Sequence, residues 1–500
     1  MIKLSKSRFL SGIQCPKKLY YNIHRSDLKP HILSQQQTLF AAGNEIGDLA
    51  RKLFPGGEDA SPSSYKDYFT SIKNTKKWIA EGVPTIYEAT FSCSGGFSAL
   101  DIFHLNQNER WAIEVKSSTS VKDYHILDAS FQYWVMSQAG FRPDRIFIMH
   151  IDNNYIRDGD IDIAKLFKLE EITAMVISNQ EWVISKKDEF IGVLNNPDEP
   201  NLGIGKQCNS PYTCEYVSHC WSHLPEKSVF ELYNAKGKDW LLYESGIMSM
   251  LDIPDDFILT DRQRIQVNGI KKNLSNIDIS KINKFISTFQ YPLHFFDFET
   301  ISTSIPLLNG TAPFDQIPFQ YSLHITDEYG NVICHHEFLP QADEFRDIKS
   351  IQEDPRVKMV KAMMKHFEIQ GSIIAYNAPF EISRIKELSI VFPEYKDFLD
   401  SLINRFIDLL IPFRNAWYYL PEMGGSASIK SVLPAIAPEF SYKDLEIGHG
   451  GLASEIYLSM IKGTFSGNIN ATRQNLLDYC ERDTEGMVVI YRHLNKIIHS

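Results

Sequence analysis

The chain has 500 residues, with 51 Lys and Arg against 62 Asp and Glu, which gives a formal net charge of -11. At this length one hydrophobic core is not enough, so we expect several domains. The acidic balance argues against a broad basic surface, although a nucleic-acid enzyme can be acidic overall and locally basic in its groove. No apolar run reaches the ~18 residues of a membrane span, and the opening MIKLSKSRFLSG lacks an apolar signal core. We therefore expect a cytoplasmic protein without a transmembrane helix.

Near the N-terminus, basic and aromatic residues alternate along an expected helix. Lys and Arg contact phosphates and aromatic rings stack on bases, so this segment could bind a single strand. An amphipathic helix with a solvated basic face would show the same pattern. The residues are Lys17, Lys18, Tyr20, Tyr21, His24, Arg25 and Lys29.

A hairpin is predicted next, with strands near Ser98–Leu105 and Trp111–Ser117. It brings together Asp101, Glu114 and Lys116 in a D…E-x-K pattern. Two carboxylates can hold Mg²⁺, while a lysine can orient a water or offset charge in the transition state. Alternating Glu and Lys also occur on ordinary exposed strands, so the pattern alone is weak.

Four of the seven cysteines are notable for their placement. Cys15 stands alone near the start, and Cys208, Cys214 and Cys220 follow a loop rich in Asn, Pro and Gly. Four thiolates suit a 4Fe–4S cluster or Zn²⁺, and His219 could replace one cysteine around zinc. The alternative is that they are unbound core cysteines, which is how we interpret Cys93, Cys334 and Cys480.

The remaining chain predicts a helical connector and a second mixed domain. We place the domains at residues 1–225, 226–288 and 289–500. Strands followed by helices favour an α/β layer architecture. The expected strands are 293–300, Gln320–Thr326, Asn331–Leu339 and Ile373–Tyr376, and the expected helices are Pro355–Ile369, one that begins at Pro379, and one at the C-terminus.

Acidic residues recur at defined places in this domain. On the strand 293–300, Asp297 and Glu299 share a face with the apolar Leu293 and Phe295, because strand side chains alternate. Magnesium prefers oxygen ligands, and two cations roughly 4 Å apart can clamp both oxygens of a phosphodiester displacement. Acids at strand ends are also often merely solvated.

Two helical segments add further candidates. Glu381 lies in the first turn after Pro379, and Tyr479 and Asp483 lie one turn apart on the last helix. Carboxylates that converge without a metal would raise one another's pKa values.

The strings DFET, YNAPFE and YCERD resemble the three motifs of the DnaQ-like (DEDDy) 3′–5′ exonucleases over residues 290–497. The resemblance implies a ribonuclease H-like fold in which Asp297, Glu299, Glu381 and Asp483 hold two Mg²⁺ or Mn²⁺ ions. Tyr479 would position the attacking water. Glu381 departs from the family, which usually has Asp there.

The N-terminal hairpin and the helix DYHILDASFQYWVMSQAG resemble the RecB-like PD-(D/E)XK nucleases, which have a restriction-endonuclease-like fold. The resemblance assigns metal binding to Asp101 and Glu114 and catalysis to Lys116 and Gln132, the glutamine of a Q-x3-Y motif. Met136 stands where the tyrosine is expected, with Tyr133 nearby. An upstream histidine is also usual in this family. The matching stretch, 43–57, offers only Glu45 and Asp48.

The nearest likeness within that group is to the CRISPR-associated RecB-like exonucleases and the AddB-type nuclease domains. These hold an iron–sulfur cluster with one cysteine before the nuclease core and three after it. Cys15, Cys208, Cys214 and Cys220 match that layout, with a wide first gap in the cluster.

A bacterial family joins such a RecB-like half to a DnaQ-like half, and this chain resembles a full-length member. The resemblance implies a nuclease that prefers DNA, with RNA still open as a substrate. The alternative is a catalytically weak scaffold that binds nucleic acid, or protein partners, within a repair or anti-phage complex.

Overall fold

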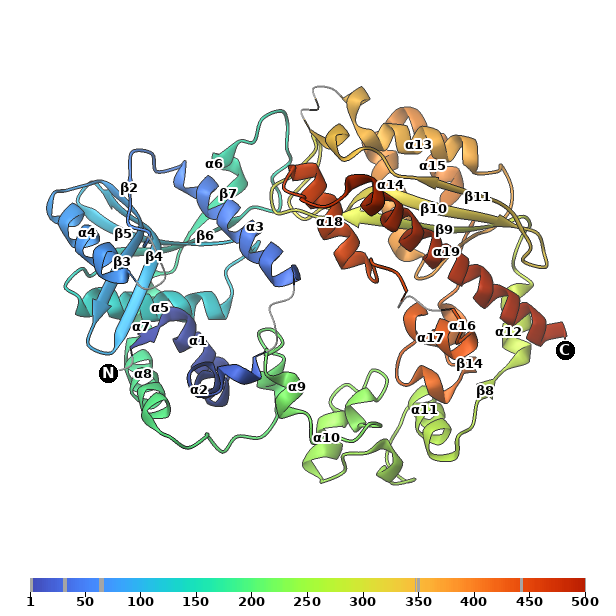
Figure 1. Ribbon diagram of the computed structural model, residues 1–500, viewed down its shortest axis with the longest axis horizontal. Coiled ribbons are helices and arrows are strands. Elements are labelled where there is room, and N and C mark those ends of the chain that lie inside the picture. The colour runs from blue at the N-terminus through green and yellow to red at the C-terminus, as the bar shows by residue number, and fades with distance from the viewer. Residues whose placement is uncertain are drawn as a thin grey trace. The chain divides into compact units, whose positions relative to one another are not determined.

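The computed structural model describes residues 3–29, 34–62, 67–346, 348, 351–440 and 444–499. The chain divides into two compact units (Figure 1). Unit 1 comprises Met1–His223 together with Thr303–Phe314, and unit 2 comprises Leu224–Ser302 and Asp315–Ser500. Among the residues described, no helix combines the length and the apolar character of a membrane span.

Unit 1 is built around one mixed sheet. Strands β3 (Thr85–Cys93), β4 (Gly96–Asn106) and β5 (Glu109–Lys116) form an antiparallel meander, and β6 (Arg145–Ile151) lies parallel to β5. The crossover between β5 and β6 is made by α5 (Asp123–Gln138), as a parallel connection requires. The strand order is β2 (Glu58–Asp59), β3 (Thr85–Cys93), β4 (Gly96–Asn106), β5 (Glu109–Lys116), β6 (Arg145–Ile151) and β7 (Phe167–Glu171), and β1 (Leu4–Ser5) pairs with β4.

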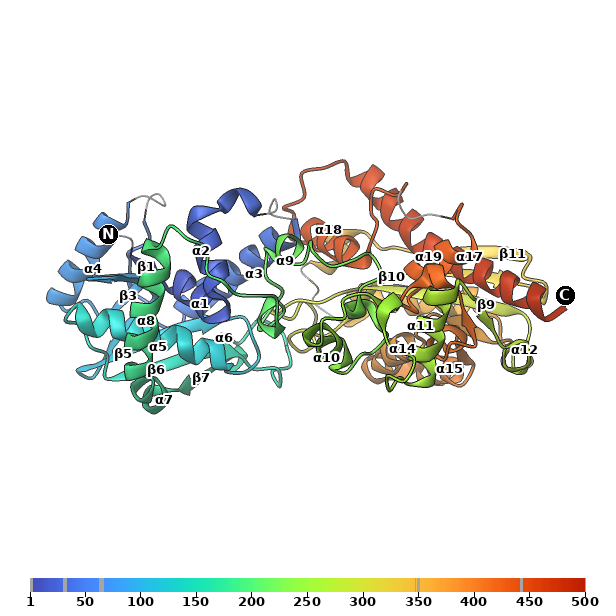
Figure 2. The ribbon, with the colours of Figure 1, turned by 90° about the horizontal axis from the view of Figure 1, so that it is seen from below.

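Helices cover both faces of this sheet. One core joins the sheet to α5, α1 (Lys6–Gln14) and α8 (Gln180–Asn195), which contact one another (Figure 2). The other core includes residues of α3 (Ser34–Arg51) packed against β5 and β6. Both faces are therefore buried, as in other sheets that contain parallel strands.

The segment Thr303–Phe314 completes unit 1 although it follows a strand of unit 2. Arg157 Nη1 donates to the carbonyls of Pro306 and Leu307, at 3.0 and 2.7 Å. Ile305 packs against the core that contains α3. The predicted boundary at residue 289 did not separate this segment from the rest of the second domain.

Unit 2 begins with helices in the predicted connector region and continues into a second mixed sheet. The connector contains α10 (Lys238–Glu244), α11 (Asp261–Lys272) and α12 (Ile279–Ile286). The strand order is β11 (Val332–Phe338), β10 (Ile317–Thr326), β9 (Leu293–Ile301), β12 (Ile373–Ala375) and β13 (Phe406–Asp408). Strands β9, β10 and β11 are antiparallel, and β12 and β13 run parallel to β9.

The alternation predicted for β9 is confirmed by the packing of its side chains. Leu293 and Phe295 enter the core that contains α19 (Ile469–His499). Phe296 and Phe298 enter the opposite core, which contains α13 (Pro355–His366), α14 (Pro379–Val391) and α15 (Lys396–Ile403). Figure 1 shows α18 (Gly450–Lys462) and α19 across β9. The predicted mixed α/β class is confirmed.

Candidate active sites

The first candidate site lies in unit 2, on the face of β9 that meets α19. Asp297 and Glu299 come from β9 and Asp483 from α19, and their ligand atoms all lie within 4.8 Å of one another. They meet because Cys480 and Thr484 of α19 are fully buried and hold the helix against the sheet. Three of the four predicted carboxylate ligands therefore form one group.

The fourth predicted ligand, Glu381, lies outside that group but beside it. It sits in the first turn of α14, is only 3% exposed, and its Oε2 has no hydrogen-bond partner among the described residues. Burial, and then the neighbouring Asp408, raise the pKa of Glu381 to about 8. Its charge also contributes to the raised pKa of Asp297.

The turn between β12 and α14 explains the position of Glu381. Asn377 adopts a left-handed φ of 75°, a conformation that Asn tolerates better than most residues. Its backbone N–H donates to Asp408 Oδ1 at 2.9 Å. Asp408, at the end of β13, thus anchors this turn and is a further buried carboxylate of the site, which the sequence did not indicate.

The carboxylates of this group repel one another strongly. Burial, followed by the charges of Asp483, Glu381 and Glu299, raises the pKa of Asp297 well above its ordinary value. Burial and Asp483 raise the pKa of Glu299 to about 8. Buried carboxylates that repel one another in this way are stabilised by a bound divalent cation.

Tyr479 lies against these acids on α19 and is 3% exposed. Burial, the charges of Asp483 and Glu299, and a hydrogen bond with Asp483 raise the pKa of the Tyr479 hydroxyl. The hydroxyl therefore keeps its proton at neutral pH and can act as a hydrogen-bond donor.

Two more residues of this site were missed by the sequence analysis. Lys430 Nζ lies 5.5 Å from the centroid of the Tyr479 ring, and its charge lowers the pKa of Glu299. Gly450 begins α18, where a β-carbon would come within 3.3 Å of Glu299 Oε2. Neither residue belongs to the quoted motifs, so only the fold reveals them.

The second candidate site lies in unit 1, where the predicted D…E-x-K residues meet around Glu114. Lys116 Nζ donates to Glu114 Oε1 at 2.8 Å and to Asp128 Oδ2 at 2.7 Å. Gln132 Nε2 donates to Glu114 Oε2 at 2.8 Å. Lys6, from the start of α1, donates to Glu114 Oε1 at 2.8 Å. Lys6 and Asp128 were not predicted to belong to the site.

Asp101 approaches this group at a point where two strands separate. The β4–β5 pairing ends at Ile102 and Ile113, one residue before Asp101 and Glu114. Instead Asp101 Oδ2 accepts the backbone N–H of Val115 at 2.6 Å. Burial, and then Glu114, raise the pKa of Asp101 to about 7.

Glu88 on β3 is a further acid of this site. It lies opposite Asp101 in the β3–β4 register, where the pairing of the two strands is interrupted for one residue. Its backbone has a left-handed φ of 51°. Arg51 Nη2 donates to Glu88 Oε1 at 3.0 Å. Asp101, Glu88, Arg51 and Lys116 all line a cavity of about 600 Å³.

Lysines compensate the acids of unit 1, in contrast to unit 2. Although burial raises the pKa of Glu114, the ammonium groups of Lys116 and Lys6 together hold it well below its usual value. A metal ion at Glu114 would have to compete with both lysines. In unit 2, Lys430 lowers the pKa of Glu299, but burial and Asp483 still keep that pKa raised, so this group is better suited to bind a metal ion.

Two further expectations for this site concerned the tyrosine position of the Q-x3-Y motif and the acids of the stretch 43–57. Met136 and Tyr133 are both buried in the core that contains α5, whereas Gln132 contacts Glu114. Asp48 lines the cavity with Asp101, whereas Glu45 is exposed and is not among its lining residues.

The four predicted cluster cysteines come from two segments that the fold holds together. Gln14, next to Cys15, donates its Nε2 to the carbonyls of Gln207 and Tyr212, at 3.0 and 2.8 Å. Burial raises the pKa of Cys15, and Cys208 adds to the shift. Burial also raises the pKa of Cys214 to about 11. In the described part of the chain, no three of these thiols, with or without His219, come within 4.8 Å of one another.

The predicted basic and aromatic patch is wrong for its two tyrosines, whereas His24 is exposed as expected. Tyr20 and Tyr21 are 8% and 1% exposed and pack with Tyr216, so they cannot stack on bases. The basic members form ion pairs within unit 1, among them Lys17 with Glu199 and Lys18 with Glu215. Charge is therefore neutralised locally.

One other group in unit 2 resembles a metal site by residue type. His324, His335 and Glu481 have ligand atoms within 4.8 Å of one another. The two imidazoles are stacked, with centroids 4.3 Å apart and planes 26° apart. Their in-plane lone pairs run side by side rather than converge, so we assign no metal here.

Comparison with known proteins gives relatives without an assigned activity. A family described as a domain of unknown function (DUF2779) matches residues 294–428, which include Asp297, Glu299 and Glu381. The uncharacterized protein MG366 of Mycoplasma genitalium is 29% identical over 216 residues, 41% of this chain and 32% of that protein. The uncharacterized protein UU173 of Ureaplasma parvum is 25% identical over 297 residues, 53% of this chain and 42% of that protein. The chain thus spans less than half the length of these curated relatives.

Proposed function

We propose that unit 2 is a metal-dependent 3′–5′ exonuclease of the DnaQ-like kind that hydrolyses nucleic acid, with DNA as the preferred substrate. The observation that carries the proposal is the convergence of Asp297, Glu299 and Asp483 within 4.8 Å on a buried face. The mixed sheet covered by helices on both faces is consistent with a ribonuclease H-like fold.

Asp297, Glu299 and Asp483, with Glu381 beside them, would hold Mg²⁺ or Mn²⁺. Such ions activate a water and stabilise charge on the phosphoryl oxygens. The protonated Tyr479 hydroxyl would orient the nucleophile by donating a hydrogen bond. Gly450 leaves open the space beside Glu299 that substrate and ions need.

Unit 1 supports a second, RecB-like PD-(D/E)XK site. Asp101, Glu114, Lys116 and Gln132 assemble around one cavity or contact its residues, as that chemistry requires. The pairing of Glu114 with two lysines favours the alternative for this unit alone, a site that binds nucleic acid and cuts it weakly.

For the four cysteines we propose a 4Fe–4S cluster in preference to zinc. A zinc tetrahedron with bonds of about 2.3 Å needs sulfurs about 3.8 Å apart. Among the described residues no three of these thiols come within 4.8 Å of one another, so they do not form that tetrahedron, and a larger cluster body is the ligand we favour. Iron and acid-labile sulfide in brown, anaerobically purified protein would support this, and colourless protein with stoichiometric zinc would contradict it.

Degradation of labelled oligonucleotides tests the proposed activities. Single- and double-stranded DNA and RNA would be incubated with the wild type, Asp297→Ala, Asp101→Ala and the double variant, with and without Mn²⁺. The exposed Asp397→Ala serves as a matched control in unit 2. We expect stepwise loss from the 3′ end in every sample that retains Asp297. Tight binding without cleavage by the wild type would favour the scaffold instead, and cleavage of RNA alone would reassign the substrate.

A further inference from the structure

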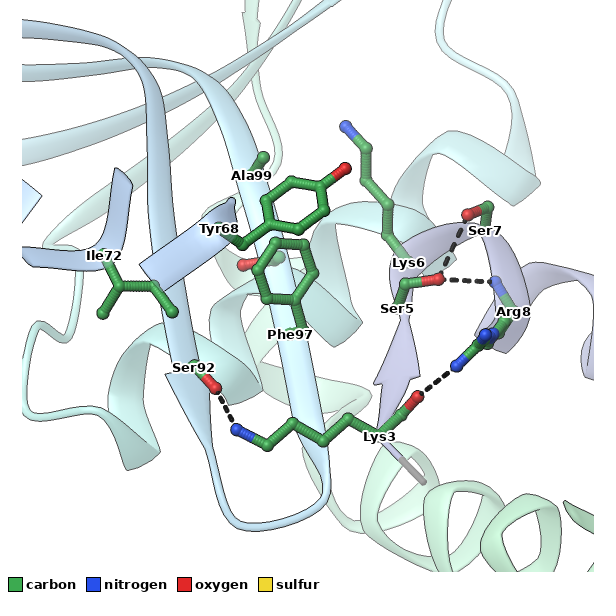
Figure 3. Close-up of a pocket in the computed structure, with 11 residues that line it drawn as sticks. Lys3, Ser5, Lys6, Ser7, Arg8, Tyr68, Ile72, Ser92, Phe97 and Ala99 are labelled. Atoms are coloured by element: carbon green, nitrogen blue, oxygen red, sulfur yellow. Dashed lines mark hydrogen bonds between the residues drawn. The ribbon is translucent and has the colours of Figure 1, made fainter. Parts of the chain in front are cut away.

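Unit 1 contains a second cavity that the proposed chemistry does not use. It has a volume of about 560 Å³ and is lined by the start of the chain through the first turn of α1, by α4 (Tyr68–Ala80), and by β3 and β4 (Figure 3). The side chains that line it are basic on one side and aromatic on the other.

The basic side consists of Lys3, Lys6 and Arg8. Lys3 Nζ donates to Ser92 Oγ at 2.6 Å, and Arg8 Nη1 donates to the carbonyl of Lys3 at 2.9 Å. Lys3 and Arg8 form no ion pair with any carboxylate in the part of the chain that the structure describes. In a chain of net charge -11, two neighbouring cations without an acidic partner favour an anionic ligand.

The start of α1 reinforces this preference. Ser5 caps the helix by accepting the N–H of Arg8 at 3.3 Å, and Ser5, Lys6, Ser7 and Arg8 all line the cavity. The positive end of the helix dipole therefore faces the same space as the basic side chains. This combination suits a phosphate group.

The aromatic side consists of Tyr68 and Phe97, whose rings meet edge to face with centroids 4.6 Å apart. Both residues are half-buried and line the cavity, as Figure 3 shows. An aromatic surface beside a phosphate site is the pattern of a nucleotide subsite.

Strand β4 leads from this cavity to the acids of the second candidate site. Strand β4 pairs with β1 at Gly96 and Phe97 and with β5 from Ile102 onward. Ala99 lines this cavity and Asp101 lines the other, about 7 Å further along the strand. Lys6 lines the cavity and also donates to Glu114.

We propose that this cavity binds one nucleotide of a single-stranded nucleic acid, with its phosphate at Lys3 and Arg8 and its base against Tyr68 and Phe97. The strand then continues along β4 to Asp101 and Glu114. The proposal deepens the proposed function by naming a single-stranded substrate and the place where unit 1 holds it.

Binding without cleavage tests the proposal separately from the nuclease activity. Fluorescence anisotropy would measure the affinity of the full chain for labelled single-stranded DNA, and for RNA of the same sequence, in EDTA. We expect Arg8→Glu to weaken binding about tenfold and to flatten its salt dependence, because a phosphate contact is replaced by repulsion. Arg8→Lys should retain most of the affinity, and Lys76→Glu, on the exposed side of α4, should change it little.

The aromatic contact needs its own measurement. An abasic oligonucleotide should bind the wild type more weakly than the intact strand does, and Tyr68→Ala should remove most of that difference. Equal melting temperatures of the variants and the wild type would show that each variant is folded. If Arg8→Glu and Tyr68→Ala bind as the wild type does, the subsite is wrong even if Mn²⁺-dependent cleavage is present. If binding falls as expected but no sample cleaves, the subsite stands and the nuclease proposal fails.

Discussion

Gly450 lies so close to Glu299 that a β-carbon on the glycine would come within 3.3 Å of the Glu299 carboxylate. This contact links the start of α18 to the metal-ligand candidates on β9. It also provides a way to disturb the site without removing any charged group.

Gly450→Ala should lower the Mn²⁺-dependent exonuclease rate about tenfold, because a misplaced carboxylate binds the ion in poorer geometry. Initial rates of 3′-end release would measure the effect. The melting temperature in EDTA should change little, since the alanine adds only one methyl group and the Glu299 side chain can shift by a few tenths of an ångström. An unchanged rate would remove Glu299 from the working site.

Without metal, the stability of unit 2 should fall as pH rises from 6 to 8. The pKa values of Glu299 and Glu381, about 8, exceed those of the unfolded chain, so the native state binds more protons over this range. Stability then decreases with pH until both groups are ionised. We expect a drop in melting temperature of about 5 °C in EDTA.

Mn²⁺ should reverse that pH dependence, because it binds the ionised carboxylates and its affinity rises as protons leave. Asp297→Asn should raise the melting temperature in EDTA and weaken the response to Mn²⁺. Calorimetry at both pH values measures all of these effects. A metal-free protein that is equally stable at pH 6 and pH 8 would contradict the raised pKa values.

In unit 1, removing Lys6 should make Glu114 more available to metal. Lys6→Met eliminates one of the two ammonium groups that donate to Glu114 Oε1. In an Asp297→Ala background we expect a larger Mn²⁺-induced rise in melting temperature than in the parent. Lys17→Met, which loses an ion pair with Glu199 elsewhere in unit 1, is the matched control and should leave the Mn²⁺ response unchanged.

Gln132→Leu should destabilise unit 1 by about 2 kcal/mol, because the buried carboxylates of Glu114 and Asp128 each lose a hydrogen-bond donor. Urea unfolding followed by the fluorescence of unit 1 tryptophans would measure the loss. Met136→Leu, one turn further along α5, preserves volume and should cost less than about 1.5 kcal/mol. Equal effects of the two substitutions would argue that Gln132 merely fills space.

The parts of the fold that follow a simple period could be predicted from the sequence. The alternation of apolar residues placed Leu293 and Phe295 on one face of β9 with Asp297, and the packing confirms it. The spacing of four residues between Tyr479 and Asp483 placed them correctly one turn apart on one face of a helix. In these elements local pattern and tertiary burial agree.

Glu88 was missed because the period of two fails at that position. Ile86 and Ala89 belong to the same core, although they are three positions apart along one strand. The left-handed φ of Glu88 produces this change of face, and nothing in the neighbouring letters signals it.

Lys6 was missed for a different reason. Its contact with Glu114 spans 108 residues and depends on the parallel pairing of the two-residue strand β1 with β4. A strand so short leaves no periodic signal in the sequence.

The excursion of Thr303–Phe314 into unit 1 has a practical consequence for dissecting the protein. A single cut after His223 would leave Arg157 without the carbonyls of Pro306 and Leu307. It would also leave Ile305 on a fragment that does not contain its packing partners. If the two halves were expressed separately from that point, the first half would lack part of its packing. The second half would carry a loop whose Ile305 has lost its apolar partners. To produce unit 2 alone, this twelve-residue stretch should be replaced by a short polar linker. To produce unit 1 alone, the stretch should be supplied as a separate peptide.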